Sequence, residues 1–241
     1  MRVLVNIGHP AHVHFFRNFI FEMRKKGNSV LITAQHKEIA INLMKAYNLE
    51  YEYLGEKYKG SVKKMVGTIY RDYLLQKVTK KYNPDILTGI LDMYSAHVGK
   101  LNKIPSIVFT DTEHAKLANM LTFPFASTIC TPSCFKDDLG KKHVKYNGYH
   151  ELAYLHPNYF KPNPTVLEEI GLNERDNFII VRFVSWQASH DIGYGGLTLE
   201  NKKKAVKEFE KYGKVLITSE SPLPSEFEKY RISVPPEKIH D

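Results

Sequence analysis

The chain opens with a strand that enters a helix through a tight turn. Residues 2–7 form a short, mainly apolar run that predicts a buried strand. Gly8 and Pro10 end that run, and apolar residues at helical spacing follow from His12 to Lys26. An open α/β sheet begins in this way, and its ligands bind at the carboxyl edge, where such turns lie. This turn also carries three imidazoles, those of His9, His12 and His14.

The same alternation of strand and helix signals continues along the chain and predicts an α/β fold. Further strands are expected at Val30–Thr33, Tyr51–Leu54, Ile86–Thr88, Ser106–Phe109, Ser127–Thr131 and Val144–Tyr146. Helices are expected at Glu38–Tyr47, from about residue 60 to Tyr82, and at Tyr94–Leu101.

A second series of the same kind follows a crossover at 148–164. Its expected elements are the strands Phe178–Val184, Lys214–Thr218 and Arg231–Val234, the helix Lys202–Tyr212, and a helix start at Pro235–Glu237. We therefore expect two Rossmann-like lobes, residues 1–155 and residues 156–241. Because the second lobe has few elements, we expect it to be truncated; a naturally small lobe is the alternative.

Charge is unevenly distributed between the two parts of the chain. Residues 1–150 hold 22 Lys and Arg against 12 Asp and Glu, whereas residues 151–241 hold 12 against 14. A basic first lobe suits phosphate groups or an anionic membrane surface, and solvated helix faces are the alternative. Nucleic acid is not expected, because no nucleic-acid motif accompanies the scattered lysines.

Other features point to a cytoplasmic protein, at most peripheral to a membrane. No apolar run is long enough to span a bilayer, and no signal peptide is evident. The two cysteines, Cys130 and Cys134, lack a companion pair and so give only a weak metal signal.

The clustered histidines are candidates for proton transfer rather than for metal binding. Positions i and i+2 of a helix point apart, so His12 and His14 cannot share a zinc ion on one face. An imidazole titrates near neutrality, so either ring could act as a general base on a hydroxyl group. Helix capping or packing under the turn is the alternative interpretation.

Acidic residues follow two other predicted strands at the same edge. Asp92 follows Ile86–Thr88, and Asp111, Glu113 and His114 follow Ser106–Phe109. Each carboxylate could cap the next helix. Alternatively, it could orient a histidine or bind sugar hydroxyls.

The segment after the first strand of the second lobe suits a diphosphate. Arg182 stands near a predicted helix start, where guanidinium and backbone N–H groups bind phosphate oxygens. The polar and aromatic residues that follow it are Ser185, Trp186, His190 and Asp191. The segment matches neither a P-loop nor a Gly-x-Gly-x-x-Gly motif.

Four separated motifs together resemble a known family. They are the stretches at 6–16, 109–115, 148–155 and 182–186, and the third contains His150 and Glu151. The chain resembles an archaeal family of uncharacterised proteins that is grouped with the GT-B glycosyltransferases and the UDP-N-acetylglucosamine 2-epimerases. Members continue beyond residues 240–241, into a donor-site loop.

This resemblance implies two GT-B lobes, with the acceptor at the first and a nucleotide-sugar at the second. It implies a glycosyltransferase acting on a lipid-linked or polysaccharide acceptor, with a sugar-nucleotide 2-epimerase or a non-catalytic sugar-nucleotide-binding protein as alternatives. No metal or bound cofactor is expected, and the nucleotide-diphosphate sugar is a substrate. The candidate catalytic residues are His12, His14, Asp111 and His114. The candidate substrate-binding residues are Gly8, His9, Asp92, Glu113, His150, Glu151, Arg182, Ser185, Trp186, His190 and Asp191.

Overall fold

The computed structural model describes residues 1–35, 38–55, 61–184 and 196–241. The chain divides into two compact units, Met1–Phe160 and Lys161–Asp241. The division falls slightly after the boundary expected at residue 155. Each unit is described by itself.

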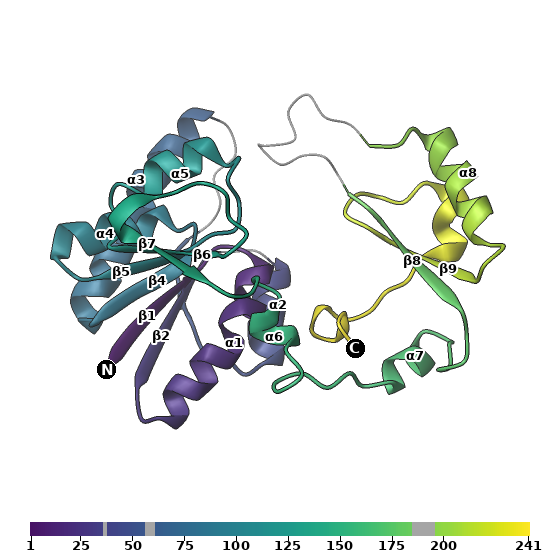
Figure 1. Ribbon diagram of the computed structural model, residues 1–241, viewed down its shortest axis with the longest axis horizontal. Helices are drawn as coiled ribbons and strands as arrows, with labels where there is room; N and C mark the ends of the chain where they lie inside the picture. The colour runs from purple at the N-terminus through teal and green to yellow at the C-terminus, as the bar shows by residue number, and fades with distance from the viewer. Residues whose placement is uncertain (36–37, 56–60, 185–195) are drawn as a thin grey trace. The chain divides into compact units, whose positions relative to one another are not determined.

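The described part of the first unit contains one parallel sheet of seven strands, in the order β3-β2-β1-β4-β5-β6-β7 (Figure 1). The strands are β1 (Arg2–Ile7), β2 (Ser29–Ala34), β3 (Glu52–Tyr53), β4 (Ile86–Ile90), β5 (Ser106–Phe109), β6 (Thr128–Pro132) and β7 (His143–Tyr146). Each lies within a few residues of its expected position. The α/β prediction is confirmed.

Side chains of the central strand β1 alternate between two cores. Val3, Val5 and Ile7 pack against helices α1 (Pro10–Lys25) and α2 (Glu38–Ala46). Leu4 points to the opposite face and packs against α3 (Ser61–Tyr82) and α4 (Met93–Asn102). Helices therefore cover both faces, which is why β1 is apolar along nearly its whole length.

The turns after the strands place polar groups at helix starts. Helix α1 begins at Pro10, two residues earlier than expected, with His9 as its N-cap, and the chain turns at Gly27 with φ of 76°. Two short helices follow in this unit, α5 (Lys116–Thr122) and α6 (Leu152–Leu155), besides a 3-10 turn at Gly140–Lys142. Asn18 of α1 ties α6 down by donating from Nδ2 to the Ala153 carbonyl, 2.9 Å away.

The second unit contains two parallel strands, β8 (Phe178–Phe183) and β9 (Lys214–Ser219), among its described residues. The helices are α7 (Thr165–Glu169) and α8 (Leu199–Phe209). Helix α8 begins earlier than expected, because the Thr198 side chain accepts from the Asn201 N–H and caps it. A small apolar core contains Phe183, Ile217 and Phe227.

One expected strand of the second unit is absent from the described residues. Residues 231–234 do not form a strand; only one parallel bridge joins Arg231 to Ile217, after the 3-10 helix Ser225–Tyr230. The prolines at 235 and 236 carry no N–H to donate, so a ladder cannot extend through them. The expected helix start there is the 3-10 turn Pro236–Lys238.

Candidate active site

All seven strands of the first sheet are parallel, so the turns that follow them lie at one edge. The candidate residues after β1, β4 and β5 and those after β7 belong to this edge. Each group is placed below by its own contacts.

The turn after β1 uses two histidines to hold its own backbone. His9 Nδ1 accepts from the Ala11 N–H at 3.2 Å, and His12 Nδ1 accepts from the Gly8 N–H at 3.3 Å. A neutral ring whose Nδ1 accepts carries its proton on Nε2. In this geometry both rings are hydrogen-bond donors at Nε2, which favours binding a ligand oxygen over removing a proton.

His14 points away from this turn, as the i, i+2 spacing predicts. It is buried, and its Nδ1 lies 3.3 Å from the Tyr47 hydroxyl, with which it shares a hydrogen bond. Its ring also packs near that of Tyr154, with 5.4 Å between centroids. The surroundings of His14 are those of a packed core histidine.

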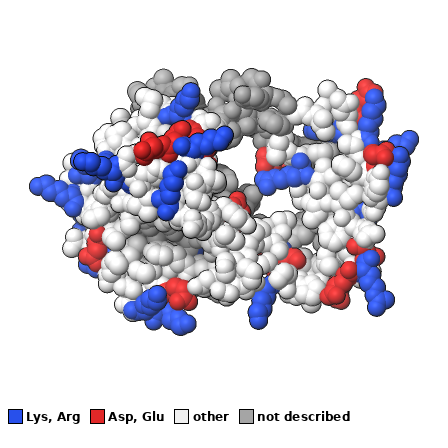
Figure 2. Space-filling view, viewed as in Figure 1, with Lys and Arg blue, Asp and Glu red and all other residues white. Residues whose placement is uncertain are grey.

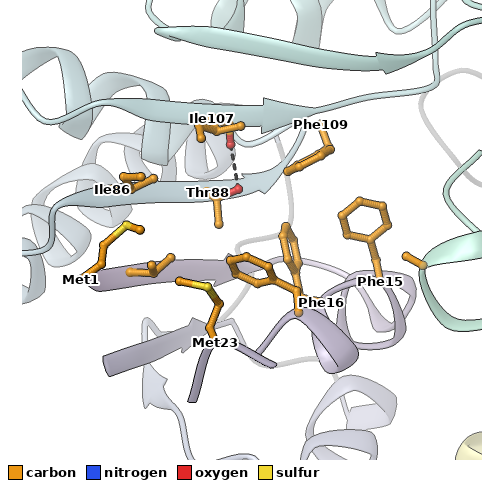
Figure 3. A pocket seen from close by; sticks show the side chains of 11 residues that line it. Met1, Phe15, Phe16, Met23, Ile86, Thr88, Ile107 and Phe109 are labelled. Carbon is orange, nitrogen blue, oxygen red and sulfur yellow. Dashed lines mark hydrogen bonds between the residues drawn. The ribbon is translucent and has the colours of Figure 1, made fainter. Parts of the chain in front are cut away.

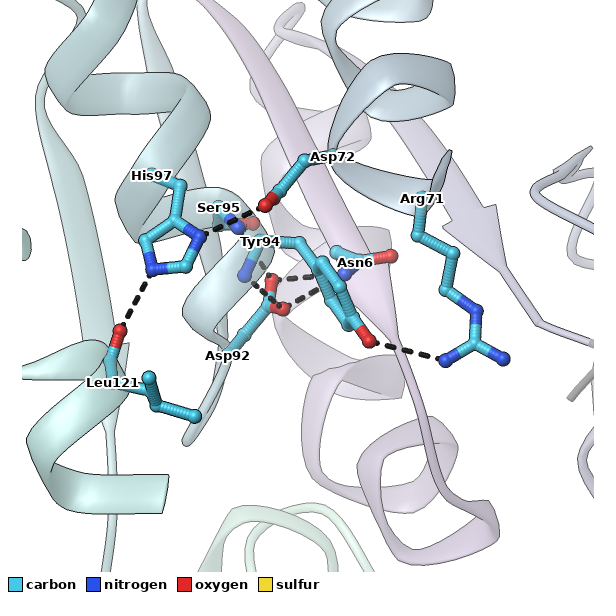
Figure 4. Close-up of polar contacts among 8 residues, drawn as sticks. All are labelled: Asn6, Arg71, Asp72, Asp92, Tyr94, Ser95, His97 and Leu121. Carbon is cyan, nitrogen blue, oxygen red and sulfur yellow. Dashed lines mark hydrogen bonds and ion pairs between the residues drawn. The ribbon is translucent and has the colours of Figure 1, made fainter. Parts of the chain in front are cut away.

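A buried hydrogen-bond network lies between β1 and β4 (Figure 4). Asn6 Nδ2 donates to both carboxylate oxygens of Asp92 at 2.9 Å, and Asn6 Oδ1 accepts from the Thr33 hydroxyl. Asp92 also caps α4, accepting from the Tyr94 and Ser95 N–H groups. The capping interpretation of Asp92 is thus confirmed.

Burial raises the pKa of Asp92 to about 6, even though the hydrogen bonds from Ser95 and Asn6 oppose this shift. Gly89 makes room for this carboxyl group. A Cβ at residue 89 would lie 2.6 Å from the Asp92 Cβ and 3.1 Å from the Asn6 carbonyl oxygen. Asp92 can therefore hold or release a proton close to neutrality.

Asp111, after β5, meets His150, which lies after β7. His150 Nδ1 is 3.2 Å from Asp111 Oδ2, and the other oxygen of Asp111 accepts from the Thr112 hydroxyl at 2.9 Å. The Asp111 side chain is 44% exposed and that of His150 is 10% exposed. Burial lowers the pKa of His150, so its ring is neutral at pH 7.

The sequence suggests His114 as the histidine next to Asp111, but in the structure Asp111 contacts His150. Helix α5 has Ala115 as its N-cap and no side-chain cap, so neither Asp111 nor Glu113 caps that helix. Glu113 accepts instead from the Lys136 N–H at 3.0 Å, and this bond lowers its pKa. His114 is exposed. Glu151 is exposed beside His150 at the start of α6.

An apolar cavity of about 410 Å³ adjoins this site (Figure 3). It lies between α1 and the face of β1, β4 and β5, and its walls include Phe15, Phe16, Met23 and Phe109. Phe15 also packs edge-on against His150, with 4.7 Å between ring centroids. An apolar wall therefore shields one side of the Asp111–His150 pair.

In the second unit, Arg182 on β8 is exposed and forms a 2.6 Å ion pair with Glu220. The other expected donor-side residues, Ser185, Trp186, His190 and Asp191, lie outside the described residues.

Sequence reasoning missed two contributors to the edge. Asn6 reads as part of the strand end, although a polar residue inside a buried strand is itself a signal for a network. The sequence does not single out Phe15, and nothing local links it to His150.

Three further properties concern metal binding, membrane-spanning helices and surface charge. Among the described residues, no group of three or more His, Cys, Asp or Glu side chains is placed to hold a metal ion. No described helix is long and apolar enough to cross a membrane. On the face shown in Figure 2, Asp and Glu lie among the Lys and Arg of both units.

Several solved structures share this fold. UDP-N-acetylglucosamine 2-epimerase from Rickettsia bellii is 14% identical with a TM-score of 0.68, over all of this chain and 70% of that one. The UDP-GlcNAc 2-epimerase of Methanocaldococcus jannaschii is 13% identical with a TM-score of 0.62, over 95% of this chain and 67% of that one. Acinetobacter baumannii MurG is 11% identical with a TM-score of 0.54, over 95% of this chain and 70% of that one. The fold is of the GT-B type, with Rossmann-like lobes.

The chain belongs to a family described as proteins of unknown function (DUF354), whose model matches residues 1–216. An uncharacterized protein of Methanocaldococcus jannaschii is 23% identical over 188 residues, which cover 75% of this chain and 55% of that protein. The chain thus spans about half the length of this curated relative. The predicted membership of an uncharacterised family beside the GT-B enzymes is confirmed.

Proposed function

We propose that this protein is a sugar-nucleotide-dependent enzyme that transfers a glycosyl group to a hydroxyl group bound at the first unit. The observation that carries the proposal is the half-exposed Asp111 carboxylate, held at the carboxyl edge by Thr112 and His150. A carboxylate so placed can accept both a hydrogen bond and a proton from a hydroxyl.

The proposed step is a displacement at the anomeric carbon of the donor. The acceptor oxygen forms a bond to that carbon while its proton passes to Asp111. The bond from the carbon to the diphosphate oxygen breaks, and its electron pair leaves with the nucleoside diphosphate. His9 and His12, as Nε2 donors, orient the acceptor or the transferred sugar.

The donor side rests on the second unit and on the comparisons. One neighbouring epimerase structure is described as bound to UDP-GlcNAc, and the structure of MnaA from S. aureus is described as a co-structure with UDP. By analogy, a nucleotide-diphosphate sugar is the proposed substrate here. Arg182 would bind its diphosphate in exchange for Glu220. No metal or bound cofactor is part of this proposal.

The proposed acceptor and cellular location are based on the charge distribution. A lipid-linked or polysaccharide acceptor at a cytoplasmic membrane surface would suit the excess of Lys and Arg over residues 1–150.

A second candidate function is 2-epimerisation of the sugar nucleotide. Asp92 favours it, because a buried carboxyl group with a pKa of about 6 can serve as acid or base near neutrality. In that case the C2–H bond of the sugar would break and reform, and no acceptor would be consumed.

One experiment separates these functions. The protein is offered UDP-, GDP- and CDP-sugars with and without an oligosaccharide acceptor, and the products are followed by NMR. Release of nucleoside diphosphate supports transfer, whereas a C2-epimer with intact nucleotide supports epimerisation. Asp111→Asn should lower the transfer rate about 10²-fold to 10⁴-fold. Asp137→Asn, at an exposed position, is the matched control.

Binding of sugar nucleotides without turnover would leave a binding protein and overturn both enzymatic functions. Failure to bind any of these sugar nucleotides would overturn the proposal altogether.

A further inference from the structure

His150 differs from an ordinary surface histidine in being almost enclosed. The residue is 8% exposed, and Phe15 packs edge-on against its ring. Asp111, its charged neighbour, reaches solvent with 44% of its side chain. Of these two groups, Asp111 is therefore the one that a ligand can touch.

The two ring nitrogens of His150 lie in opposite surroundings. Nδ1 is 3.2 Å from Asp111 Oδ2, whereas Nε2 is buried and has no hydrogen-bond partner among the described residues. A proton on Nδ1 faces a carboxylate, but a proton on Nε2 would be a buried donor without an acceptor, which costs about 1–3 kcal/mol. The neutral Nδ1–H tautomer is therefore favoured.

Asp111 would then be held at both oxygens. The Thr112 hydroxyl donates to Oδ1 at 2.9 Å, and the His150 Nδ1–H would donate to Oδ2. The remaining lone pairs of the exposed carboxylate accept hydrogen bonds only. They fit a hydroxyl of a sugar or polyol and repel a phosphate.

We propose that His150 is a positioning residue that fixes the Asp111 carboxylate, as a Nδ1–H donor, for a ligand hydroxyl. This inference rests on the proposed function for the identity of the ligand. The hydrogen bond between His150 and Asp111 does not depend on the proposed function, so the inference and the proposed function can fail separately.

The tautomer is tested on the intact protein by ¹⁵N–¹H correlation of the imidazole rings. His150 should show the Nδ1–H pattern at pH 7. His143 is the internal reference, because its Nδ1 accepts from the Leu139 N–H and its Nε2 lies 2.7 Å from the Thr131 hydroxyl, which requires the opposite tautomer. A His150 ring protonated on Nε2 would overturn the proposal.

The positioning role is tested with two substitutions that differ in one donor. His150→Asn keeps an N–H at about the place of Nδ1, and His150→Phe keeps an aromatic ring against Phe15 without any donor. With an active sugar nucleotide and its acceptor, His150→Phe should lower kcat by about 100-fold at little-changed KM, because the carboxylate is misplaced. His150→Asn should recover most of that loss.

His143→Phe serves as the matched control for replacing a buried histidine. It should lower the melting temperature and leave kcat near that of the wild type. Equal kcat losses in His150→Asn and His150→Phe would contradict positioning through Nδ1. If the wild-type protein turns over no sugar nucleotide, the proposed function fails, and the tautomer alone decides whether His150 holds Asp111.

Discussion

At the scale of single residues, the surroundings of each histidine decide its protonation. His97 has acceptors at both nitrogens, since Nδ1 lies 3.0 Å from Asp72 Oδ2 and Nε2 donates to the Leu121 carbonyl at 2.8 Å. The bond with Asp72 is the main reason why its pKa is raised. His150 has an acceptor at only one nitrogen, and burial lowers its pKa. The same kind of side chain thus has a raised pKa in one place and a lowered pKa in another.

Asp92 gives a pH dependence of stability with a definite sign. Its pKa rises from 3.8 to about 6 on folding, so between these values the folded state binds more protons than the unfolded state. The free energy of unfolding should therefore fall as pH rises from about 4 to 6, by about 3 kcal/mol from this group.

Chemical denaturation at pH 4 and pH 7 measures this effect as the difference between wild type and Asp92→Asn. The substitution keeps a cap for α4 but cannot ionise, so it should remove the contribution of this group. An equal pH dependence in the two proteins would show that Asp92 is not the source.

At the scale of elements, His97 joins three helices on one face of the first sheet. It belongs to α4, its ion-pair partner Asp72 to α3, and the Leu121 carbonyl to α5 (Figure 4). Its ring also packs edge-on against Phe125, with 4.7 Å between centroids. The contact connects helices far apart in the sequence through a single ring.

The helix contact of His97 should weaken at high pH. Because its folded pKa is raised above 6.5, its contribution to stability is complete below about 6.5 and is lost as pH rises through the folded pKa. His97→Gln should cost about 1–2 kcal/mol at pH 6 and less at pH 9. Urea unfolding at the two pH values provides the measurement. A cost that does not change with pH would mean that the ring acts through packing alone.

Elements were predictable where local chemistry determines them. The apolar run of β1, the proline at the start of α1 and the carboxylate cap of α4 are all visible in the sequence. The pairing of Asp111 with His150 could not be predicted from the sequence. It depends on β6 and β7 joining the sheet next to β5, which brings the turn after β7 close to the turn after β5. Residues 231–234 have a strand-like composition, but they form only one parallel bridge with Ile217, and the prolines that follow prevent the ladder from continuing.

At the scale of the whole molecule, the two units differ in the size of the sheet and of the apolar core that stabilise them. The described first unit has a parallel sheet with helices on both faces and buried clusters on each. The described second unit has one pair of strands and a single small cluster. A two-stranded sheet is at most marginally stable without a large apolar face.

Residues 1–160 expressed alone should therefore fold cooperatively, whereas residues 161–241 alone should not. Circular dichroism and amide dispersion in NMR spectra of the two fragments test this difference. A folded second fragment, or an unfolded first one, would contradict this account of where stability resides.

The hydrogen bonds from Asn6 to Asp92 have a consequence for how the first sheet can receive a ligand. The chain leaves β1 toward β2 on one side and β4 toward β5 on the other, so these neighbouring strands mark the topological switch point where α/β sheets usually open a crevice. Here two side chains close that crevice with bonds to each other. A ligand therefore reaches the Asp92 carboxyl group only where these bonds to Asn6 break, and its other binding groups must come from the turns after the later strands.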